Sequence, residues 1–285
     1  MAIPDEAIDI DYLREWIGCE DVTTDAVTTD LVRKFHATLD LPGEPAAEGS
    51  PAPALVHYCL APPVISTAAL GIDGHPQRGG FLPPIPLPRR MWAGSGLNFI
   101  RPILVGDLVR RVSRISDVAV KQGRSGTLAF VTVEHVLDVA GDISIQETQD
   151  IVYRGLGDAG TPIPMAASAP VSSHQRVVLP SAALLFRYSA LTFNGHRIHY
   201  DRSYAIDEEG YPGLVVHGPM QATMLLHHAI ATRGMTPANY AFRSQAPLFD
   251  TAPMRLEAVE EGARTILWTA RPDGPVAMRA EVGWS

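Results

Sequence analysis

The sequence predicts an α+β fold made of two similar halves, each with helices followed by a meander of antiparallel strands. Three observations indicate this class. The chain has 285 residues, which corresponds to roughly two domains. Two dense groups of alternating or β-branched segments predict strands, and glycine-containing turns separate their members. Segments with helical spacing of apolar residues precede both groups.

The first half begins with two predicted helices. Apolar spacing indicates helices over Asp11–Ile17 and Thr28–Leu39, the second capped by Thr28 or Thr29. Residues Leu41–Ala54 predict a loop rich in proline and glycine. The irregular segment Gly71–Arg90 is long enough that it either lines a ligand or forms an extended linker. The predicted strands are Met91–Ile100, Asp107–Val118, Thr127–Val139 and Ile143–Arg154.

The second half repeats this order after a linker. Gly155–Ser173 is rich in glycine, alanine, proline and serine, which favours a connection. Helices are predicted over Ala182–Thr192 and Met220–Ala231, with a polar loop over Phe193–Pro212 between them. The last predicted strands are Tyr240–Ala246, Met254–Val259, Thr265–Ala270 and Val276–Val282.

A local match supports an internal repeat. Pro102 and Pro247 each precede an apolar pair and a return strand, at an offset of 145 residues. We therefore expect an N-terminal domain over residues 1–155, a linker over 156–173 and a C-terminal domain over 174–285.

Composition limits the partners and the compartment. The net charge is −8, and there is no basic run longer than Arg89-Arg90 or Arg110-Arg111, which argues against nucleic acid. Cys19 and Cys59 lie in neither a CxxC motif nor a metal-binding spacing. The start of the sequence lacks a signal peptide pattern, and its apolar stretches are shorter than the roughly 20 residues that cross a bilayer. We expect a cytoplasmic protein without a membrane partner.

Polar groups concentrate between the two apolar helices of the second half. Asn194, His196, Arg197, His199 and Tyr200 fall within seven positions of one loop. A solvated loop whose histidines cap helices would explain this segment by itself. A metal site is a weaker alternative: His196 and His199 have a plausible ligand spacing, and Asp201 is the one further candidate, so we assign no metal.

The tripeptide His217-Gly218-Pro219 favours catalysis. A glycine before an apolar helix lets a substrate approach the backbone N–H at the positive helix end. Such a donor stabilises the oxyanion that forms when a thioester carbonyl becomes an enolate. Pro219 suits the first helical position, and a histidine of near-neutral pKa supplies a general base.

The loop resembles the hydratase-2 motif of MaoC-like enoyl-thioester hydratases, roughly G-D-x-N-P-[IL]-H-x-D. Residues Phe193–Asp201 match it, with His199 at the catalytic histidine and Asn194 at the position of the catalytic aspartate. The variant LTFNGHRIHYD, with VHGPM downstream and GGFLPPIPLPRRMWAGS in the first half, is similar to one branch. That branch contains mesaconyl-C4-CoA and itaconyl-CoA hydratases and 3-hydroxyacyl-thioester dehydratases.

The resemblance implies a double hot-dog fold: two antiparallel sheets, each wrapped around a central helix. The helix near Pro219 would be central in the second, catalytic half. The first half lacks a matching Asn/His pair, and its equivalent of the motif segment, His57–Pro63, is interrupted by prolines. This half would therefore form a non-catalytic wall of the substrate tunnel. We expect a homodimer, because exposed sheet edges often pair.

The resemblance also implies a reaction. Water would add to the double bond of an α,β-unsaturated acyl-CoA. The expected acyl group is a branched C5 dicarboxylic one, so that mesaconyl-C4-CoA or itaconyl-CoA would give citramalyl-CoA. His199 would take a proton from water, Gly218 would polarise the thioester carbonyl, and Asn194 would orient water or the imidazole. An amide cannot act as a second base. No cofactor is required, because CoA is part of the substrate.

A free carboxylate on the acyl group would need a cation, and arginine binds carboxylates with two hydrogen bonds. The candidate substrate-binding residues are Arg197, Arg90 beside Trp92, Arg243, Trp92 itself by stacking, and His217.

Three other functions remain open from the sequence. The same residues could dehydrate a 3-hydroxyacyl thioester of fatty-acid metabolism. A thioesterase would need a carboxylate or nucleophile beside the helix end, which Asn194 does not supply. A non-catalytic protein that binds acyl thioesters would explain the amide at this position, but not the retained His199 and Gly218.

Overall fold

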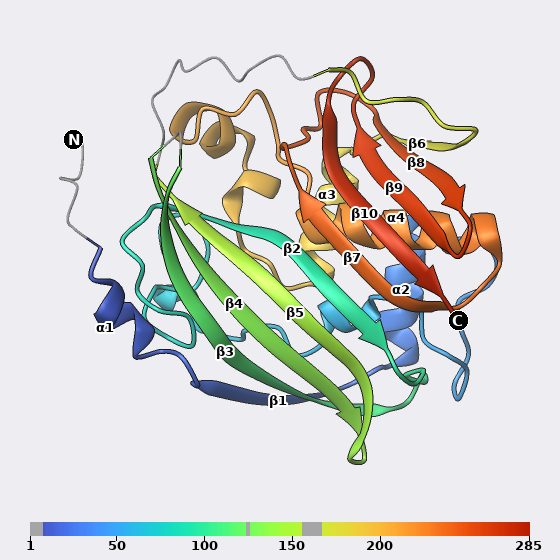
Figure 1. Cartoon of the computed structure of the whole chain (residues 1–285), viewed down its shortest axis with the longest axis horizontal. Coiled ribbons are helices and arrows are strands. Elements are labelled where there is room, and N and C mark those ends of the chain that lie inside the picture. The colour runs from blue at the N-terminus through green and yellow to red at the C-terminus, as the bar shows by residue number, and fades with distance from the viewer. Residues whose placement is uncertain (1–7, 124–125, 156–166) are drawn as a thin grey trace.

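All strands of the described residues join into one antiparallel sheet. The computed structural model describes residues 8–123, 126–155 and 167–285. The strand order is β1-β3-β4-β5-β2-β7-β10-β9-β8-β6, so the strands of the first half lie together and those of the second half follow (Figure 1). The bounds are β1 Glu20–Ala26, β2 Arg89–Phe99, β3 Leu108–Gly123, β4 Gly126–Val139, β5 Asp142–Arg154, β6 His174–Val178, β7 Pro237–Ser244, β8 Met254–Glu261, β9 Arg264–Ala270 and β10 Val276–Trp284.

The expected two sheets are continuous through one strand pair. β2 pairs with β7 over Gly94–Asn98, because pairing satisfies backbone groups that two separate sheets would leave open at their edges. Gly94 is required at this seam, since a Cβ there would overlap the carbonyl oxygen of Phe242. Immediately before the seam, the register of β2 against β5 shifts between Trp92 and Gly94, which marks a β-bulge.

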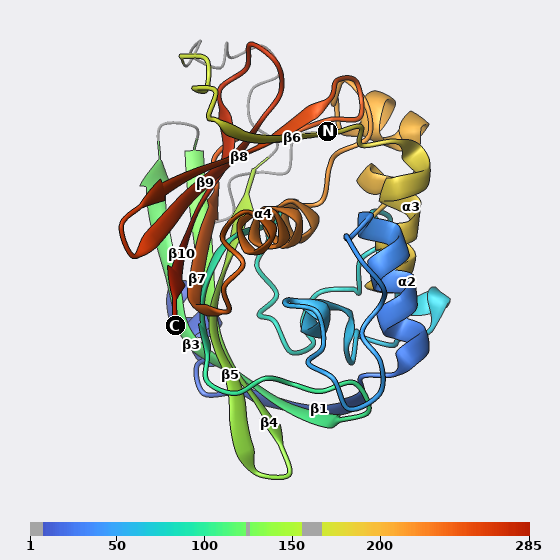
Figure 2. The same cartoon turned by 90° about the vertical axis from the view of Figure 1, so that its right-hand side faces the viewer.

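The helices lie on one side of the sheet. α1 spans Ile10–Arg14, α2 Thr29–Leu39, α3 Ala182–Leu191 and α4 Gly218–Arg233. The side chains of Thr28 and Ser181 cap α2 and α3, as their sequence positions suggest. Figure 2 shows α4 end-on between the sheet and the pair α2 and α3. α4 is buried on most of its faces, as expected for the central helix of the second half.

The first half has no long central helix among its described residues. The expected helix is replaced by two short 3-10 helices, Val56–Cys59 and Thr67–Ala69. Prolines surround them, and Leu55 and Ala61 have positive φ angles of 64° and 43°, which an α-helix does not allow. The expectation of one central helix in each half is therefore correct only for the second half.

The internal repeat is visible in matching hydrogen bonds. The N–H of Ala52 donates to the carbonyl of Ile103 at 2.8 Å, and the N–H of Val216 donates to the carbonyl of Leu248 at the same distance. Ile103 and Leu248 are 145 residues apart, the offset that the sequence predicts. By the same correspondence, Ala54 occupies the position at which α4 starts in the second half.

The sequence did not predict the two edge strands, β1 and β6. β1 is rich in acidic and hydroxyl side chains, and β6 has five residues, so neither has a strong apolar alternation. Residues 156–166 of the expected linker lie outside the described residues. Its last part runs along the second half, where the N–H of Ser172 donates to Glu257 at 2.8 Å and Ala169 is buried.

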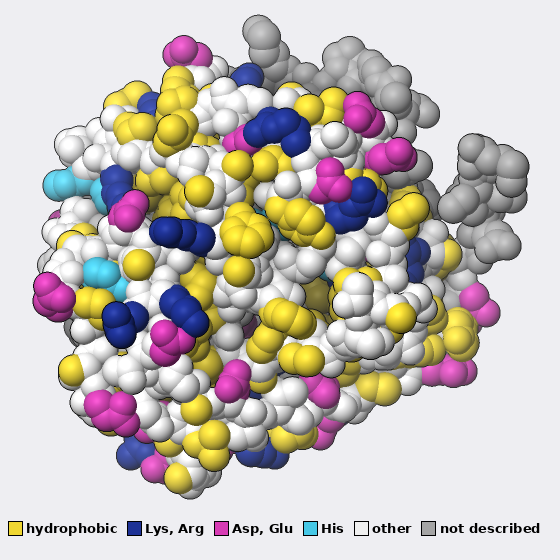
Figure 3. Space-filling view, turned by 180° about the vertical axis from the view of Figure 1, so that it is seen from behind, with side chains coloured by type: hydrophobic (Ala, Val, Ile, Leu, Met, Phe, Trp, Pro, Cys, Tyr) yellow, Lys and Arg dark blue, Asp and Glu magenta, His cyan; other side chains and the backbone are white. Residues whose placement is uncertain are grey.

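The surface shows charges of both signs. In the space-filling view from behind (Figure 3), Lys and Arg side chains are interspersed with Asp and Glu among scattered hydrophobic groups. Over the described part of the chain, no helix combines the length and the apolar character that crossing a membrane requires.

Candidate active site

The loop between α3 and α4 folds back on itself. The side-chain oxygen of Asn194 accepts a hydrogen bond from the N–H of His196 at 3.0 Å, and the N–H of Asn194 donates to the carbonyl of Ser189 at 2.8 Å. A one-turn 3-10 helix, Arg197–His199, follows. This local bonding turns His199 toward the start of α4, as the motif requires.

His199 is buried with a defined tautomer. Its Nδ1 lies 2.8 Å from the carbonyl oxygen of Val215. A carbonyl only accepts, so Nδ1 holds the proton and Nε2 presents a lone pair. Burial lowers the pKa of His199 from 6.5 to about 4, although the hydrogen bond to Val215 raises it. His199 is therefore neutral near pH 7 and suited to accept a proton.

His217 packs against His199. The two rings stack with centroids 3.7 Å apart and planes inclined by 19°. The Nε2 of His217 lies 2.8 Å from the hydroxyl of Ser189 on α3, and Tyr188 covers the ring from 5.0 Å. Burial lowers the pKa of His217 well below its usual value. Because the side chain is 1% exposed, it supports His199 rather than facing a substrate.

Gly218 is the first residue of α4, directly after His217. The first N–H groups of a helix have no intrahelical partner, and the helix dipole makes this end positive. A Cβ at Gly218 would stand 3.7 Å from the hydroxyl of Ser244 and 3.8 Å from the carbonyl oxygen of Trp92. The N–H of Gly218 and the lone pair of His199 thus belong to adjoining parts of one site.

The first half contributes a loop from the irregular segment Gly71–Arg90, in which the sequence analysis named Arg90 but neither Asp73 nor His75. The N–H of Arg197 donates to the carbonyl of Asp73 at 2.9 Å. Gly74, with φ +85°, lies directly against Gly195, and a Cβ on Gly74 would overlap the carbonyl oxygen of Gly195. The two glycines therefore allow the backbones of the two loops to touch.

This contact brings a carboxylate and a histidine to the catalytic loop. His75 Nδ1 lies 3.0 Å from Asp73 Oδ2, and the ring of His75 lies 3.9 Å from the ring of His196. The ring of His196 meets His199 edge-on at 5.4 Å. The ligand atoms of Asp73, His75 and His196 all lie within 4.8 Å of one another, a spacing that a metal ion could use, although the Asp73–His75 hydrogen bond already occupies two of them.

The charges in this loop follow from burial and pairing. Burial alone would raise the pKa of Asp73, but the hydrogen bonds and charge of His75 hold it well below its usual value. Burial lowers the pKa of His75, its bond to Asp73 raises it, and the positive charge of Arg90 lowers it, with a net decrease. Burial and the neighbouring histidines lower the pKa of His196. Near pH 7 the loop holds a carboxylate and neutral imidazoles.

Two of the three candidate arginines, Arg197 and Arg243, are not placed to bind the acyl carboxylate. Arg197 donates hydrogen bonds to the carboxylate of Asp201 at 2.8 and 3.1 Å and to the carbonyl of Ile72 at 3.1 Å. Its guanidinium therefore stabilises the two loops and is not placed to bind a substrate carboxylate. Arg243 is exposed on β7 while its neighbours Tyr240 and Phe242 are buried, so it lies on the sheet face away from α4. These two expected substrate contacts are therefore corrected.

Arg90 lies beside the histidines. It is on β2, hydrogen-bonds the hydroxyl of Tyr153 on β5, and its charge acts on both His75 and His196. Trp92, two residues on, donates from Nε1 to the hydroxyl of Ser95 at 2.9 Å. The carbonyl of Trp92 lies close to Gly218 at the start of α4. Two residues of β2 therefore lie near the site: Trp92 at the helix start and Arg90 near the histidines.

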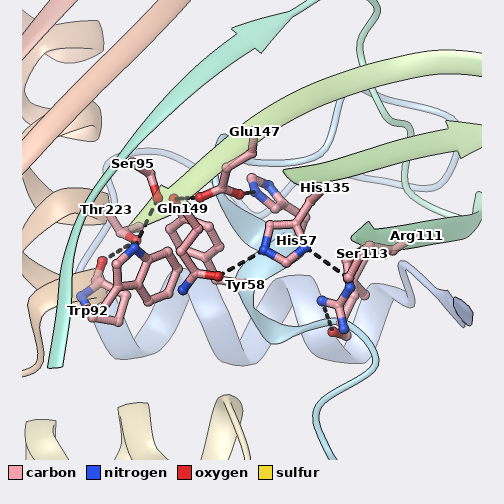
Figure 4. A network of polar contacts seen from close by, with 12 residues as sticks. His57, Tyr58, Trp92, Ser95, Arg111, Ser113, His135, Glu147, Gln149 and Thr223 are labelled. Carbon is pink, nitrogen blue, oxygen red and sulfur yellow. Dashed lines mark hydrogen bonds and ion pairs between the residues drawn. The ribbon is translucent and has the colours of Figure 1, made fainter. Parts of the chain in front are cut away.

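A buried polar network surrounds Glu147 in the first half (Figure 4). Glu147 bonds His57 at 3.3 Å and the hydroxyl of Tyr58 at 3.1 Å. Tyr58 meets the ring of Trp92 edge-on at 4.9 Å, which connects the network to the site. Burial would raise the pKa of Glu147, but its bond to His57 and the charges of His57 and His135 lower it.

Comparison with known proteins fixes the family. A family model described as hydroxyacyl-thioester dehydratase type 2 matches residues 55–250. The mesaconyl-C(4)-CoA hydratase of Chloroflexus aurantiacus is 47% identical over 274 residues, which cover 94% of this chain and 96% of that protein. The chain belongs to the type 2 hydroxyacyl-thioester dehydratase family.

As a member of this dehydratase family, the protein is a hydro-lyase, an enzyme of the hydratase and dehydratase class. A second family relative, the mitochondrial hydroxyacyl-thioester dehydratase type 2 of Schizosaccharomyces pombe, is 27% identical over 212 residues, covering 66% of this chain and 69% of the relative. The predicted resemblance to MaoC-like hydratases is confirmed.

Solved structures confirm the double hot-dog fold of this dehydratase. The crystal structure of HtdX from Mycobacterium tuberculosis matches with a TM-score of 0.68 at 18% identity, covering 94% of this chain and 100% of HtdX. Another protein of that organism, described as having a double hotdog fold, matches with a TM-score of 0.56 at 13% identity, covering 94% and 96% of the two chains.

Proposed function

We propose that this dehydratase-family enzyme adds water to the double bond of a branched C5 dicarboxylic acyl-CoA, with mesaconyl-C4-CoA as its substrate and citramalyl-CoA as its product. The observation on which this depends is the pairing of His199 and Gly218. A neutral imidazole, whose Nδ1 is bonded to Val215, stacks on the residue before a helix start, and the first N–H groups of a helix are donors that can bind a thioester oxygen.

The steps follow from this pairing. Nε2 of His199 takes a proton from water while the water oxygen bonds to the β-carbon. The electrons of the double bond move toward the thioester oxygen, and the N–H of Gly218 stabilises the resulting enolate. A proton then bonds to the α-carbon. Asn194 contributes orientation, since its carbonyl group is already bonded within the loop and an amide does not carry protons.

Arg90 supports a substrate with a free carboxylate next to the reacting carbon. In mesaconyl-C4-CoA that carboxylate is attached to the carbon that water attacks, so its cation must lie near the catalytic base. Arg90 is the candidate arginine whose charge acts on His75 and His196. The first half would then supply the wall of the tunnel that recognises the acyl group, through Arg90 and Trp92.

The proposed function is tested by incubating the protein with mesaconyl-C4-CoA, itaconyl-CoA and crotonyl-CoA and following the loss of enoyl-thioester absorbance. We expect mesaconyl-C4-CoA to have the highest kcat/KM. His199→Ala should lower kcat by about 10²–10⁴, the usual contribution of a general base. Tight CoA binding without turnover of any substrate would instead support a non-catalytic acyl-thioester binding protein.

Arg90→Met tests the substrate assignment. We expect kcat/KM for mesaconyl-C4-CoA to fall by about 10- to 100-fold, the value of a hydrogen bond to a charged group, while crotonyl-CoA, which lacks the carboxylate, is affected little. Arg243→Met on the outer face is the matched control and should leave both unchanged. An equal loss with both substrates would contradict carboxylate recognition by Arg90.

The alternative is a 3-hydroxyacyl-thioester dehydratase of fatty-acid metabolism, which the family name favours. A preference for crotonyl-CoA over mesaconyl-C4-CoA would support it. We further propose a cytoplasmic homodimer, for which the free Cys19 and Cys59 and the sheet edges β1 and β6 are the supporting features. Light scattering of the purified protein measures the oligomeric state.

A further inference from the structure

The proposed hydration needs two proton transfers. The first takes a proton from water as its oxygen bonds to the β-carbon, and His199 makes this transfer. The second delivers a proton to the α-carbon. Asn194 cannot make it, because an amide does not carry protons, and His217 is enclosed by Ser189 and Tyr188. A partner of His199 for the second transfer would therefore come from another part of the chain.

We propose that Asp73 and His75, both from the first half, form the acid pair that delivers the proton to the α-carbon. This inference rests on the proposed function. It assigns a catalytic role to the half of the chain that lacks the hydratase motif.

The geometry of the pair suits a proton carrier. The carboxylate of Asp73 accepts from Nδ1 of His75 at 3.0 Å, so Nε2 of His75 is the end that can take up and release a proton. Asp73 also accepts from the N–H of His75 at 3.0 Å, which fixes the carboxylate. The ring of His196 contacts both His75 and His199, so all three imidazoles belong to one continuous cluster that joins the two halves.

The electrostatics of the cluster favour His75 as the histidine that carries the proton between the two transfers, because its imidazolium has a counter-ion. Four histidines line the site: His75, His196, His199 and His217. His75 is the one that hydrogen-bonds a carboxylate. A protonated His199 would face the stacked His217 without a counter-ion, whereas a protonated His75 is paired with Asp73.

The loop contact is built to hold this pair in place. Gly74 and Gly195 touch through their backbones, and the N–H of Arg197 bonds the carbonyl of Asp73 at 2.9 Å. The guanidinium of Arg197 also donates to the carbonyl of Ile72 at 3.1 Å. The motif loop therefore holds Ile72, Asp73 and Gly74, the three residues that precede His75.

The proton balance closes. His199 takes a proton from water as the oxygen–carbon bond forms, and a bridging water passes that proton to Nε2 of His75. The imidazolium, stabilised by Asp73, gives the proton to the α-carbon as the enolate electrons form the carbon–hydrogen bond. Both histidines end neutral, and nothing is oxidised or reduced.

His75→Gln and Asp73→Asn test the inference in the full-length enzyme with mesaconyl-C4-CoA. We expect His75→Gln to lower kcat by about 10²–10⁴ and Asp73→Asn to lower it less, with KM changed by less than threefold in both. His36→Gln, on the exposed side of α2, is the matched control and should retain wild-type kinetics. A structural role alone would raise KM and lower the melting temperature.

The outcomes are distinguishable. Wild-type kcat in His75→Gln, beside an inactive His199→Ala, would overturn this inference and leave the proposed function in place. A wild-type protein inactive on all three enoyl-CoA substrates would overturn both. Loss of wild-type activity in EDTA, restored by Zn²⁺, would assign Asp73, His75 and His196 to a metal and overturn the acid pair.

Discussion

Burial keeps the imidazole rings of the site neutral, and this has a measurable effect on pH dependence. His199 faces the carbonyl of Val215, the stacked ring of His217 and the edge of His196. None of these groups is a carboxylate that would stabilise an imidazolium. Desolvation therefore determines the pKa of His199.

We predict that the acid limb of the kcat/KM profile for mesaconyl-C4-CoA lies near pH 4, because the pKa of His199 is lowered from 6.5 to about 4. The same shift affects stability. A histidine whose folded-state pKa is lowered binds a proton first in the unfolded state, so the free energy of unfolding decreases as the pH falls from 6.5 toward 4. An acid limb near pH 6.5 would contradict the burial of this base.

At the scale of elements, the long apolar segments were predictable and the contacts between distant loops were not. α2, α3, α4 and both meanders follow from periodicity and capping. The edge strands β1 and β6 were missed because they have little apolar alternation. The absence of a long central helix from the described residues of the first half was indicated only by the prolines in the corresponding segment.

The candidate site follows the same division. His199 stacks on His217, which directly precedes Gly218, because one loop and one helix start contain all three. Asp73 and His75 were missed because they approach from more than 100 residues away through a contact between two loops. The available signal was a charged Asp-Gly-His sequence inside the irregular segment that was expected to line a ligand.

The contact between Gly74 and Gly195 predicts a specific loss of activity. We expect Gly74→Ala to lower kcat/KM more than tenfold, because the new Cβ would push the loop with Asp73 and His75 away from Gly195. Gly43→Ala is the matched control: its φ is +77°, similar to that of Gly74, but no atom lies within 4 Å of the added Cβ. Similar kinetics for the two variants would show that backbone strain, and not the loop contact, determines the effect.

At the scale of the whole molecule, the two halves share both a sheet and a site. β2 and β7 pair across the seam, and the apolar core extends from Val27 and Leu97 in the first half to Tyr240 and Leu256 in the second. Neither half could separate without exposing strand edges and apolar surface.

We therefore predict a single cooperative transition in calorimetry, with the calorimetric enthalpy of unfolding equal to the van't Hoff enthalpy. A ligand such as CoA should raise the temperature of that one transition. Two resolved transitions would show instead that residues 1–155 and 174–285 unfold as independent domains.

The β-bulge in β2 determines which side chains of the strand face the candidate site. Leu97 and Ser95 point to the interior and alternate with the exposed Asn98 and Gly96. Uninterrupted alternation would bring Ala93 and then Met91 inward. The one additional residue before Gly94 reverses the parity of the strand, so Met91 is exposed and Arg90 is partly buried beside the histidines. Deleting one residue at the bulge would restore the alternation of the strand. The uncharged thioether of Met91 would then point inward in place of the positively charged Arg90.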